Sequence, residues 1–457
     1  MSLPDIAKRE SRFTTTQLIE ALTETRARTL ELVNDLSEEQ LIGPRLEIVN
    51  PLRWEIGHIA WFQEFWVLRH LDGLPPILKT GDELYDSARV AHDTRWDLPL
   101  LQRDQTLAYM QQVLERAIDQ ASQANHYRTD AEGYDQEYFL NLVLLHEQMH
   151  DEAITYTRQT LSYPPPKFAA ASNERLEEQR TPPFAQTNNC QTGDAEIPGG
   201  KFTLGSAVEQ GFVFDNEQLA HEVEIAPFAV SRTAVTNGEF KNFVEDGGYR
   251  RNEFWTAEGS QWRIAVNAEH PVYWQRERNG LWLRRDFDAW IALDERLPVV
   301  HVNWHEANAY CRWANRRLPT ETEWERAASA EATESLKRQK RRYPWGDNSP
   351  TSENANLDWR ALGHLPVDAL PAGDSAFGCR QMIGNVWEWT ASDFKPYPGF
   401  VAGPYKEYSE PWFGDHKVLR GGCWATRSGL IHNSYRNFYV PDRRDVWAGF
   451  RTCALQR

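Results

Sequence analysis

The sequence predicts a multidomain protein of mixed α and α+β class, in which a four-helix bundle precedes a domain of short strands and long loops. Apolar residues recur every three or four positions from about residue 14 to 162, as they do in amphipathic helices. A proline-rich stretch then breaks this period, and short β-like runs separated by Gly-, Pro- and Asn-rich turns follow it. A chain of 457 residues is also long enough for more than one domain.

Four helices are expected, in the segments 14–41, 51–72, 101–126 and 134–162. Pro51 is suited to the first turn of the second helix, and Asp72-Gly73 is a typical stop. Four helices with one long connection favour a bundle. The expected domains are therefore a bundle over 1–162, a linker over 163–195 and an α+β domain over 196–457, in which WHEANAYCRWANRR is the one clear helix.

Composition excludes several classes of function. Lys and Arg number 50 against 66 Asp and Glu, a net charge of −16, so the chain should not bind nucleic acid through its phosphates. It has no run of about 20 apolar residues for a membrane helix and no apolar core of a secretory signal near its start, so we expect a soluble, cytoplasmic protein. Five scattered cysteines without a CxxC pair indicate neither a disulfide framework nor a zinc-thiolate site.

The strongest local motif is LLHEQMHDEA, in the fourth expected helix. His146 and His150 stand four residues apart, so they project from one helix face and can reach one metal ion. Their apolar neighbours predict burial, and buried imidazoles need partners. The motif also matches the HExxH of zinc proteases, with Glu147 as general base, but that function needs a third ligand in a protease fold.

A third ligand is available in the second expected helix, where WEIGHIAWF surrounds His58 with apolar and aromatic residues. On its own His58 is more typical of a structural histidine, but with His146 and His150 it suggests a three-histidine site. Such a site suits Zn(II) with one water, or Fe(II) that binds both substrate and O2, and the ligand type alone does not choose between them.

The order of His58 followed by HxxxHxE resembles the DinB-like domain of ergothioneine sulfoxide synthases. The second domain contains PVVHVNWHEANAYCRWANRRLPTETEWERAA, YPWGD, GNVWEWT, VLRGGCWAT and AGFRT, which resemble the signatures of the formylglycine-generating-enzyme fold, a C-type-lectin-like fold. The resemblance spans nearly the whole chain. It implies a non-haem Fe(II) enzyme that uses O2 to join a chalcogen donor to C2 of the imidazole of hercynine, at a site between the two domains.

The resemblance also implies roles for individual residues. The three histidines would be the iron ligands, and Glu152 would orient one of them through a hydrogen bond. Tyr405, in YKEYSEPWF, would be the catalytic phenol that delivers a proton or an electron. The segment SYRNFYVPDRR would line the hercynine pocket, where aromatic faces suit a quaternary ammonium, through Asn437, Phe438 and Tyr439.

Departures from the family pattern bear on the donor. The Asp that follows an Asn-Trp pair in mycobacterial-type relatives is absent after Asn437, and Met149 replaces a glutamine. Relatives that use glutamylcysteine carry an Arg-rich segment where this chain reads LYDSARVAHDTRWDLPL, with only Arg89 and Arg95 as cations and with added acids such as Asp86. This acidic segment resembles the selenoneine synthase branch, whose donor is a seleno-sugar; a sulfur donor, cysteine or γ-glutamylcysteine, is the alternative.

Three other functions remain open from the sequence. A formylglycine-generating enzyme would need a copper-binding cysteine pair, for which Cys423 and Cys453 are candidates, and would leave the bundle histidines without a purpose. A zinc-dependent DinB-like thiol transferase would be indifferent to O2, and a non-enzymatic carbohydrate- or peptide-binding module would show no metal-dependent turnover. In the preferred hypothesis the partners are small molecules only: hercynine, a seleno-sugar or thiol donor, and O2.

Overall fold

The computed structural model describes the chain except residues 1–13, 124–127, 169–192, 208–211, 332–339 and 456–457. It divides into two compact units, one of residues 1–169 with 208–213 and one of residues 170–207 with 214–457. Most of the expected linker, residues 169–192, lies outside the described residues. No helix in the described ranges is long and apolar enough to cross a membrane.

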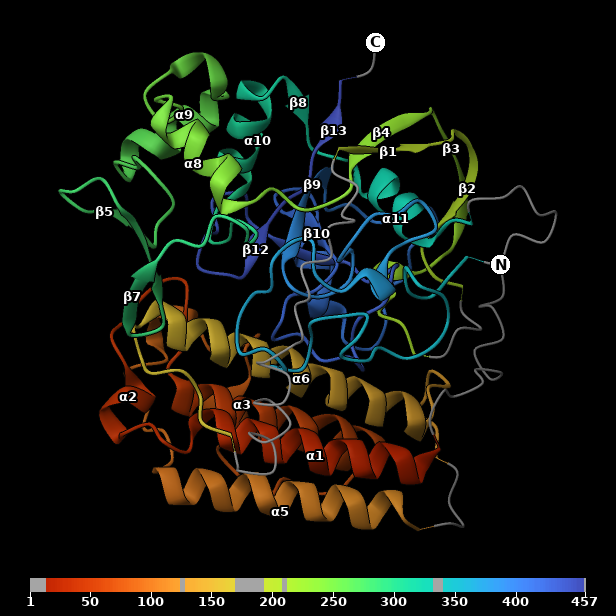
Figure 1. Ribbon diagram of the computed structural model, residues 1–457. Coiled ribbons are helices and arrows are strands. Elements are labelled where there is room, and N and C mark those ends of the chain that lie inside the picture. Colours follow the sequence, from red (N-terminus) through yellow and green to blue (C-terminus); the bar gives the residue numbers. More distant parts are fainter. Residues whose placement is uncertain (1–13, 124–127, 169–192, 208–211, 332–339, 456–457) are drawn as a thin grey trace. The chain divides into compact units, whose positions relative to one another are not determined.

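The first unit contains the four expected long helices, which run alongside one another (Figure 1). They are α1 (Thr15–Val33), α3 (Leu52–Gln63), α5 (Arg103–Ala121) and α6 (Gln136–Thr160). α1 and α3 each pack against both α5 and α6, which closes the bundle. The short helices α2 (Glu38–Ile42) and α4 (Gly81–Tyr85) and the 3-10 helix η3 (His92–Thr94) lie in the connections.

Local sequence explains where these helices begin. Thr14 accepts a hydrogen bond from the backbone N–H of Gln17, whose side chain bonds back to Thr14, so a capping box starts α1. α6 has a simple N-cap, in which the side chain of Asp135 accepts a hydrogen bond from the backbone N–H of Tyr138. The helix after Pro51 does not stop at Gln63 but continues as a π-helix, η2 (Glu64–Leu71), a form that residue periodicity did not predict.

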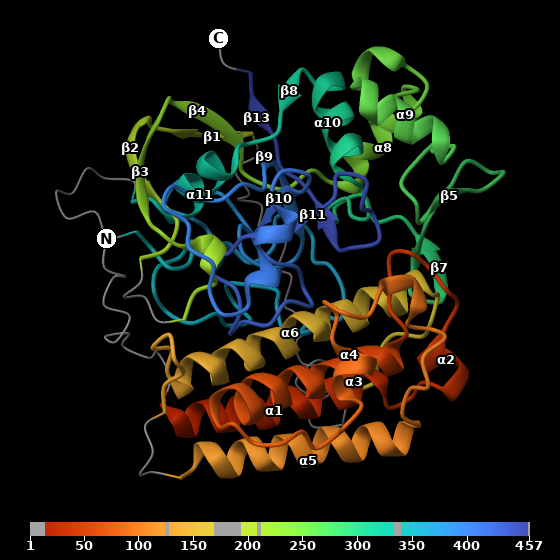
Figure 2. The ribbon, with the colours of Figure 1, turned by 180° about the vertical axis from the view of Figure 1, so that it is seen from behind.

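The second unit contains short strands in four sheets. Strands β9 and β12 pair in parallel, and the other strand pairs between named strands are antiparallel. Figure 2 shows β10 beside β11. In sheet order the strands are β1 (Asp194–Ile197), β4 (Phe228–Ser231), β13 (Cys453–Ala454) and β8 (Arg316–Arg317); β11 (Asn437–Tyr439), β10 (Lys417–Arg420), β9 (Trp387–Asp393) and β12 (Ala448–Gly449); β2 (Gly200–Leu204) and β3 (His221–Ile225); and β5 (Trp274–Arg276), β6 (Trp282–Asp286) and β7 (Ala289–Ala292).

The expectation of one clear helix in this unit is wrong, because its described residues form four α-helices. They are α8 (Asn237–Glu245), α9 (Ala257–Ala265), α10 (Trp304–Trp313) and α11 (Glu321–Ser329). Each spans only two to three turns, too few for a clear apolar period. Their N-caps were the available signal, since a side-chain oxygen of Thr236, Thr256, Asn303 or Thr320 accepts a backbone N–H at each start.

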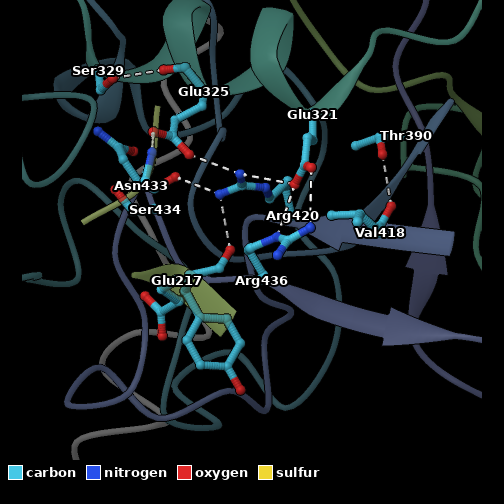
Figure 3. Close-up of polar contacts among 12 residues, drawn as sticks. Glu217, Glu321, Glu325, Ser329, Thr390, Val418, Arg420, Asn433, Ser434 and Arg436 are labelled. Carbon is cyan, nitrogen blue, oxygen red and sulfur yellow. Dashed lines mark hydrogen bonds and ion pairs between the residues drawn. The ribbon is translucent and has the colours of Figure 1, made fainter. Parts of the chain in front are cut away.

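A buried network of opposite charges ties α11 to the β10 sheet. Figure 3 shows the guanidinium groups of Arg420 and Arg436 directed at Glu321. Arg420 lies 2.7 Å from Glu325 and 3.3 Å from Glu321, and Arg436 lies 3.0 Å from Glu321. Lys340 also pairs with Glu325. Because each carboxylate has cationic partners, the network can remain charged in the interior.

Candidate metal centre

Three histidines of the first unit converge at one point. His58 lies on α3, and His146 and His150 lie one turn apart on α6. One ring nitrogen of each lies within 4.8 Å of the others, and the Nε2 atoms of His146 and His150 are 3.2 Å apart. The structure thus brings together the three histidines that the sequence selected.

In two of these rings, the Nδ1 nitrogen forms a hydrogen bond with an oxygen atom of the protein. Nδ1 of His58 lies 2.7 Å from the carbonyl oxygen of Tyr85, and Nδ1 of His150 lies 2.5 Å from Oε1 of Glu55. Donation from Nδ1 leaves Nε2 with its lone pair, the arrangement found in metal-ligating histidines. Gly57 allows this contact, because a Cβ there would lie 2.3 Å from the ring of Tyr85.

Aromatic side chains fix the planes of the rings. Trp54 stacks on His58 with centroids 4.8 Å apart and planes 9° apart. Phe62 stacks on His146 with centroids 3.5 Å apart and planes 7° apart. All these residues are buried, so the rings have little freedom to turn.

Burial keeps the imidazoles of His58 and His146 neutral. It lowers the pKa of His58 to about 3, with the nearby His150 adding to the effect, and it lowers the pKa of His146 well below its ordinary value. Burial alone would raise the pKa of Glu55, but its electrostatic and hydrogen-bond interactions with His150 outweigh this effect, so the pKa is lowered. Neutral nitrogens beside an ionised carboxylate fit a divalent metal ion, because a metal ligand must be deprotonated.

The zinc-protease alternative does not fit this geometry. Glu147, its proposed general base, accepts hydrogen bonds from Arg26 at 2.7 and 3.1 Å and from Thr29 at 2.8 Å, both on α1. It is 1% exposed and is engaged in this ion pair. Glu152 is also buried on α6, two residues after His150, and its role in orienting a ligand remains a prediction.

The predicted donor-binding residues of the first unit lie in the segment after α4. Oδ1 of Asp86 accepts a hydrogen bond from the N–H of Ala88 at 2.9 Å, and Oδ2 pairs with Arg89 at 3.0 Å. Both carboxylate oxygens therefore bind residues of the same local turn. The Arg89 side chain is 68% exposed. Arg95 is instead buried, with its guanidinium carbon 3.8 Å from the ring centroid of Trp54.

In the second unit, the predicted catalytic tyrosine belongs to an aromatic row. The ring of Tyr405 stacks on Tyr408 with centroids 5.9 Å apart, and Tyr408 meets the edge of Phe438 at 5.7 Å. Phe438 stacks in turn on Phe394 at 4.0 Å. The structure therefore joins Tyr405 to the predicted hercynine-pocket residue Phe438 through Tyr408, which the sequence analysis did not select.

The other two predicted pocket residues flank Phe438 in β11. Asn437 and Tyr439 lie on the opposite strand face from Phe438, because side chains alternate along a strand. Oδ1 of Asn437 accepts the N–H of Phe438 at 2.8 Å, and the guanidinium of Arg443 lies 5.2 Å from the ring centroid of Tyr439. All three are half-buried, and their binding role remains a prediction.

The cysteines do not resemble a copper site. Cys423 and Cys453 are buried, and burial raises the pKa of Cys453 to about 12. A thiol held protonated in this way is a poor metal ligand, because metals bind the thiolate.

Comparisons with known proteins cover both units. Residues 179–455 match the sulfatase-modifying factor enzyme 1-like domain, and residues 21–154 match the DinB superfamily. The hercynine oxygenase of Mycobacterium tuberculosis is 38% identical, with 95% of this chain and 98% of that protein covered. The chain belongs to the hercynine oxygenase family. This confirms the family resemblance and the fold class, a DinB-like bundle followed by a formylglycine-generating-enzyme-like domain.

Other relatives agree. The hercynine oxygenase of Mycolicibacterium smegmatis is 36% identical, with 95% of this chain and 97% of that protein covered. The formylglycine-generating enzyme of Streptomyces coelicolor is 32% identical but covers 57% of this chain. The match to the hercynine oxygenases spans nearly the whole chain, so the protein is an enzyme, an oxidoreductase of this family.

Two residues that support the metal centre were not predicted from the sequence. Glu55 holds His150, and Trp54 stacks on His58. The signal was present in WEIGH, because an acid among apolar helix residues, one turn before a candidate ligand, is costly to bury without a partner.

Proposed function

We propose that the protein is a non-haem iron enzyme that uses Fe(II) and O2 to attach a chalcogen atom to C2 of the imidazole of hercynine. The observation that carries this proposal is the convergence of His58, His146 and His150, the first two of them buried, in a chain that matches hercynine oxygenases over nearly their full length. In the reaction the imidazole would lose its C2 hydrogen and the donor its Se–H or S–H hydrogen as the new C–Se or C–S bond forms, which releases two electrons. A second two-electron oxidation would convert the bonded chalcogen to its oxide, so that one oxygen atom of O2 ends in this oxide and the other, with the two hydrogens, in water.

His58, His146 and His150 would hold the iron. Bound Fe(II) would supply coordination positions for the donor and O2 and the redox chemistry between them. Tyr85 and Glu55 would keep His58 and His150 in the tautomer with a free Nε2. Trp54, stacked on His58, and Phe62, stacked on His146, would shield the ligands from water and prevent the imidazole rings from rotating.

Tyr405 would deliver a proton during turnover, and Phe438 would face the trimethylammonium group of hercynine. The contact row through Tyr408 supports a shared role, since a shift of one ring moves the others. Tyr405→Phe keeps the ring and removes the phenol. We expect it to divert turnover toward oxidation of the donor alone, measured as the ratio of hercynine adduct to oxidised donor; an unchanged ratio would remove this role.

For the donor we propose a seleno-sugar. Three contacts support a donor without carboxylates: Arg95 contacts Trp54 and Asn50, and Arg89 pairs with Asp86, so both guanidinium groups have partners within the chain. A glutamyl donor would need such groups as bidentate partners. The sulfur alternative is favoured by one observation, the 38% identity to a hercynine oxygenase.

A competition between two donors, measured by mass spectrometry, tests both the proposed reaction and the proposed donor. The Fe(II)-loaded protein receives hercynine and O2 with selenoglucose and γ-glutamylcysteine together. We expect the hercynine–selenium adduct to dominate. A dominant sulfur adduct would keep the iron chemistry and overturn the donor, and no adduct with either donor would overturn the proposed function.

A further inference from the structure

Arg95 is connected to the metal centre by three consecutive hydrogen bonds. Nη1 of Arg95 donates to Oδ1 of Asn50 at 2.6 Å, and Nδ2 of Asn50 donates to Oε2 of Glu55 at 2.7 Å. Oε1 of Glu55 then lies 2.5 Å from Nδ1 of His150. Both ends of the Asn50 amide are used, so its orientation is set by the cation on one side and the carboxylate on the other.

A second contact connects the same arginine to another histidine. The guanidinium of Arg95 lies 3.8 Å from the ring centroid of Trp54, and Trp54 also stacks on His58 with ring centroids 4.8 Å apart. Nε1 of Trp54 donates to the carbonyl oxygen of Leu84 at 2.7 Å, which fixes the indole along its own plane. Arg95 thus contacts Trp54, which stacks on His58 of α3, and Asn50, which donates to Glu55, the partner of His150 of α6.

Burying the charged Arg95 side chain is costly, so its contacts with Asn50 and, through it, Glu55 must offset this cost. Its side chain is 8% exposed, and a guanidinium loses hydration when it is buried. Its charged counterpart is Glu55, reached through Asn50, while Nη2 donates to the carbonyl oxygen of Val90 at 3.3 Å. A neutral amide between two charges transmits their attraction without a direct ion pair, which leaves Oε1 of Glu55 to His150.

We propose that Arg95 is a positioning residue of the metal centre, which fixes His150 through Asn50 and Glu55 and fixes His58 through Trp54. This inference rests on the proposed role of the three histidines as metal ligands. It replaces the role in donor binding that the sequence suggested for Arg95. It also connects the segment after α4, where the family pattern varies, to the ligand set itself, so changes in this segment alter the geometry of the metal.

The test measures metal binding by the full chain without any substrate. The variants are Arg95→Lys, which keeps the charge but loses the planar fork, Asn50→Ala and the double variant, with Arg53→Lys as the control. Arg53 lies on α3, as Trp54 and Glu55 do, but it pairs with Glu38. Affinity for Fe(II) and Co(II) is measured by competition with a chelator, and the visible bands of the Co(II) form report the ligand geometry.

We expect each single variant to weaken metal affinity by about 10-fold and to shift the Co(II) bands, since outer-shell partners of metal ligands have effects of this order. The double variant should lose less than the product of the two single losses, because both changes break one chain of contacts. Arg53→Lys should match the wild type. If Arg95→Lys fails to fold, as judged by its thermal unfolding, Asn50→Ala decides the question.

Kinetics separate positioning from donor binding. Unchanged metal affinity and Co(II) bands with a raised KM for the donor would overturn the inference and restore Arg95 as a donor-binding residue. Because the metal titration needs no turnover, this inference can fail while the wild type forms the hercynine adduct. Failure of the proposed function would instead appear as wild-type protein that binds metal and makes no adduct.

Discussion

The two units each contain a buried polar cluster, and the clusters differ in how their groups are satisfied. In the second unit, Glu321 and Glu325 face Arg420 and Arg436, and the opposite charges meet directly. In the bundle, the supported sides of His58 and His150 face protein oxygens while the ligand nitrogens face one another within 4.8 Å. The first arrangement is complete as it stands, whereas the second presents lone pairs to a common point.

This difference distinguishes a structural cluster from a binding site. A network of paired charges stabilises only the packing that it joins, and removing one partner leaves the others uncompensated. Converging lone pairs gain from a cation placed between them. We therefore expect changes in the bundle cluster to act on metal binding and changes in the second cluster to act on stability.

The largest expected effect is that of His150→Ala on metal binding. Removing one of three ligands should abolish stoichiometric iron binding and reduce adduct formation below detection. The measurement is metal content after desalting, together with adduct yield. His70→Ala is the control, because His70 lies on η2 and contacts Asp130. Full activity of His150→Ala would remove the site assignment.

The opposite expectation holds for Arg420→Leu. It removes the buried cation that Glu321 and Glu325 share, so that Glu321 keeps only Arg436 and Glu325 only Lys340, which should lower the free energy of unfolding by about 3–5 kcal/mol. Metal content of the folded protein should not change. Denaturant unfolding checks the first point, with the exposed Arg251→Leu as a control that should alter stability little. A loss of iron without a loss of stability would contradict the comparison.

The pH dependence of the metal-free protein sharpens the comparison. The folded pKa of His58 is about 3, against an ordinary value of 6.5. Because the unfolded chain takes up this proton first, the free energy of unfolding should fall as the pH is lowered from 6.5 toward 3. His58→Gln does not titrate and should show a shallower fall in denaturant midpoint over this range. Equal slopes for both proteins would show that His58 is not held neutral.

The smallest expected effect comes from the partner of His150. Glu55→Gln keeps the shape of the side chain and removes its charge, and we expect metal affinity to fall by about 10- to 100-fold. Glu152→Gln tests the residue that the family resemblance suggested. Chelator competition on both variants decides which carboxylate orients the ligand, and a larger loss for Glu152→Gln would reverse our assignment.

Much of the ligand set could be predicted because it follows local rules. His146 and His150 share a face because a helix repeats every 3.6 residues, and an imidazole among apolar residues needs a partner. Glu55 could have been found by the same reasoning applied to carboxylates. The bundle was predictable for a similar reason, since its long helices carry a clear apolar period.

What the sequence did not show depends on contacts between distant segments. Arg95 and Asn50 are 45 residues apart, and no periodicity predicts that the loop turns the arginine inward. Tyr85 supports His58 through a backbone carbonyl, which every residue type possesses. The short helices α8, α9 and α11 are set by caps and packing, so patterns of hydrophobicity did not detect them.

Oxygen uptake tests the central claim most directly. The Fe(II)-loaded protein is mixed with hercynine and the donor in air-saturated buffer, and O2 consumption is followed together with adduct formation. We predict uptake that needs both substrates, matches the adduct formed and stops when the iron is removed or replaced by Zn(II). Equal adduct formation without O2, or with Zn(II) in the site, would contradict the account and favour a zinc-dependent transferase.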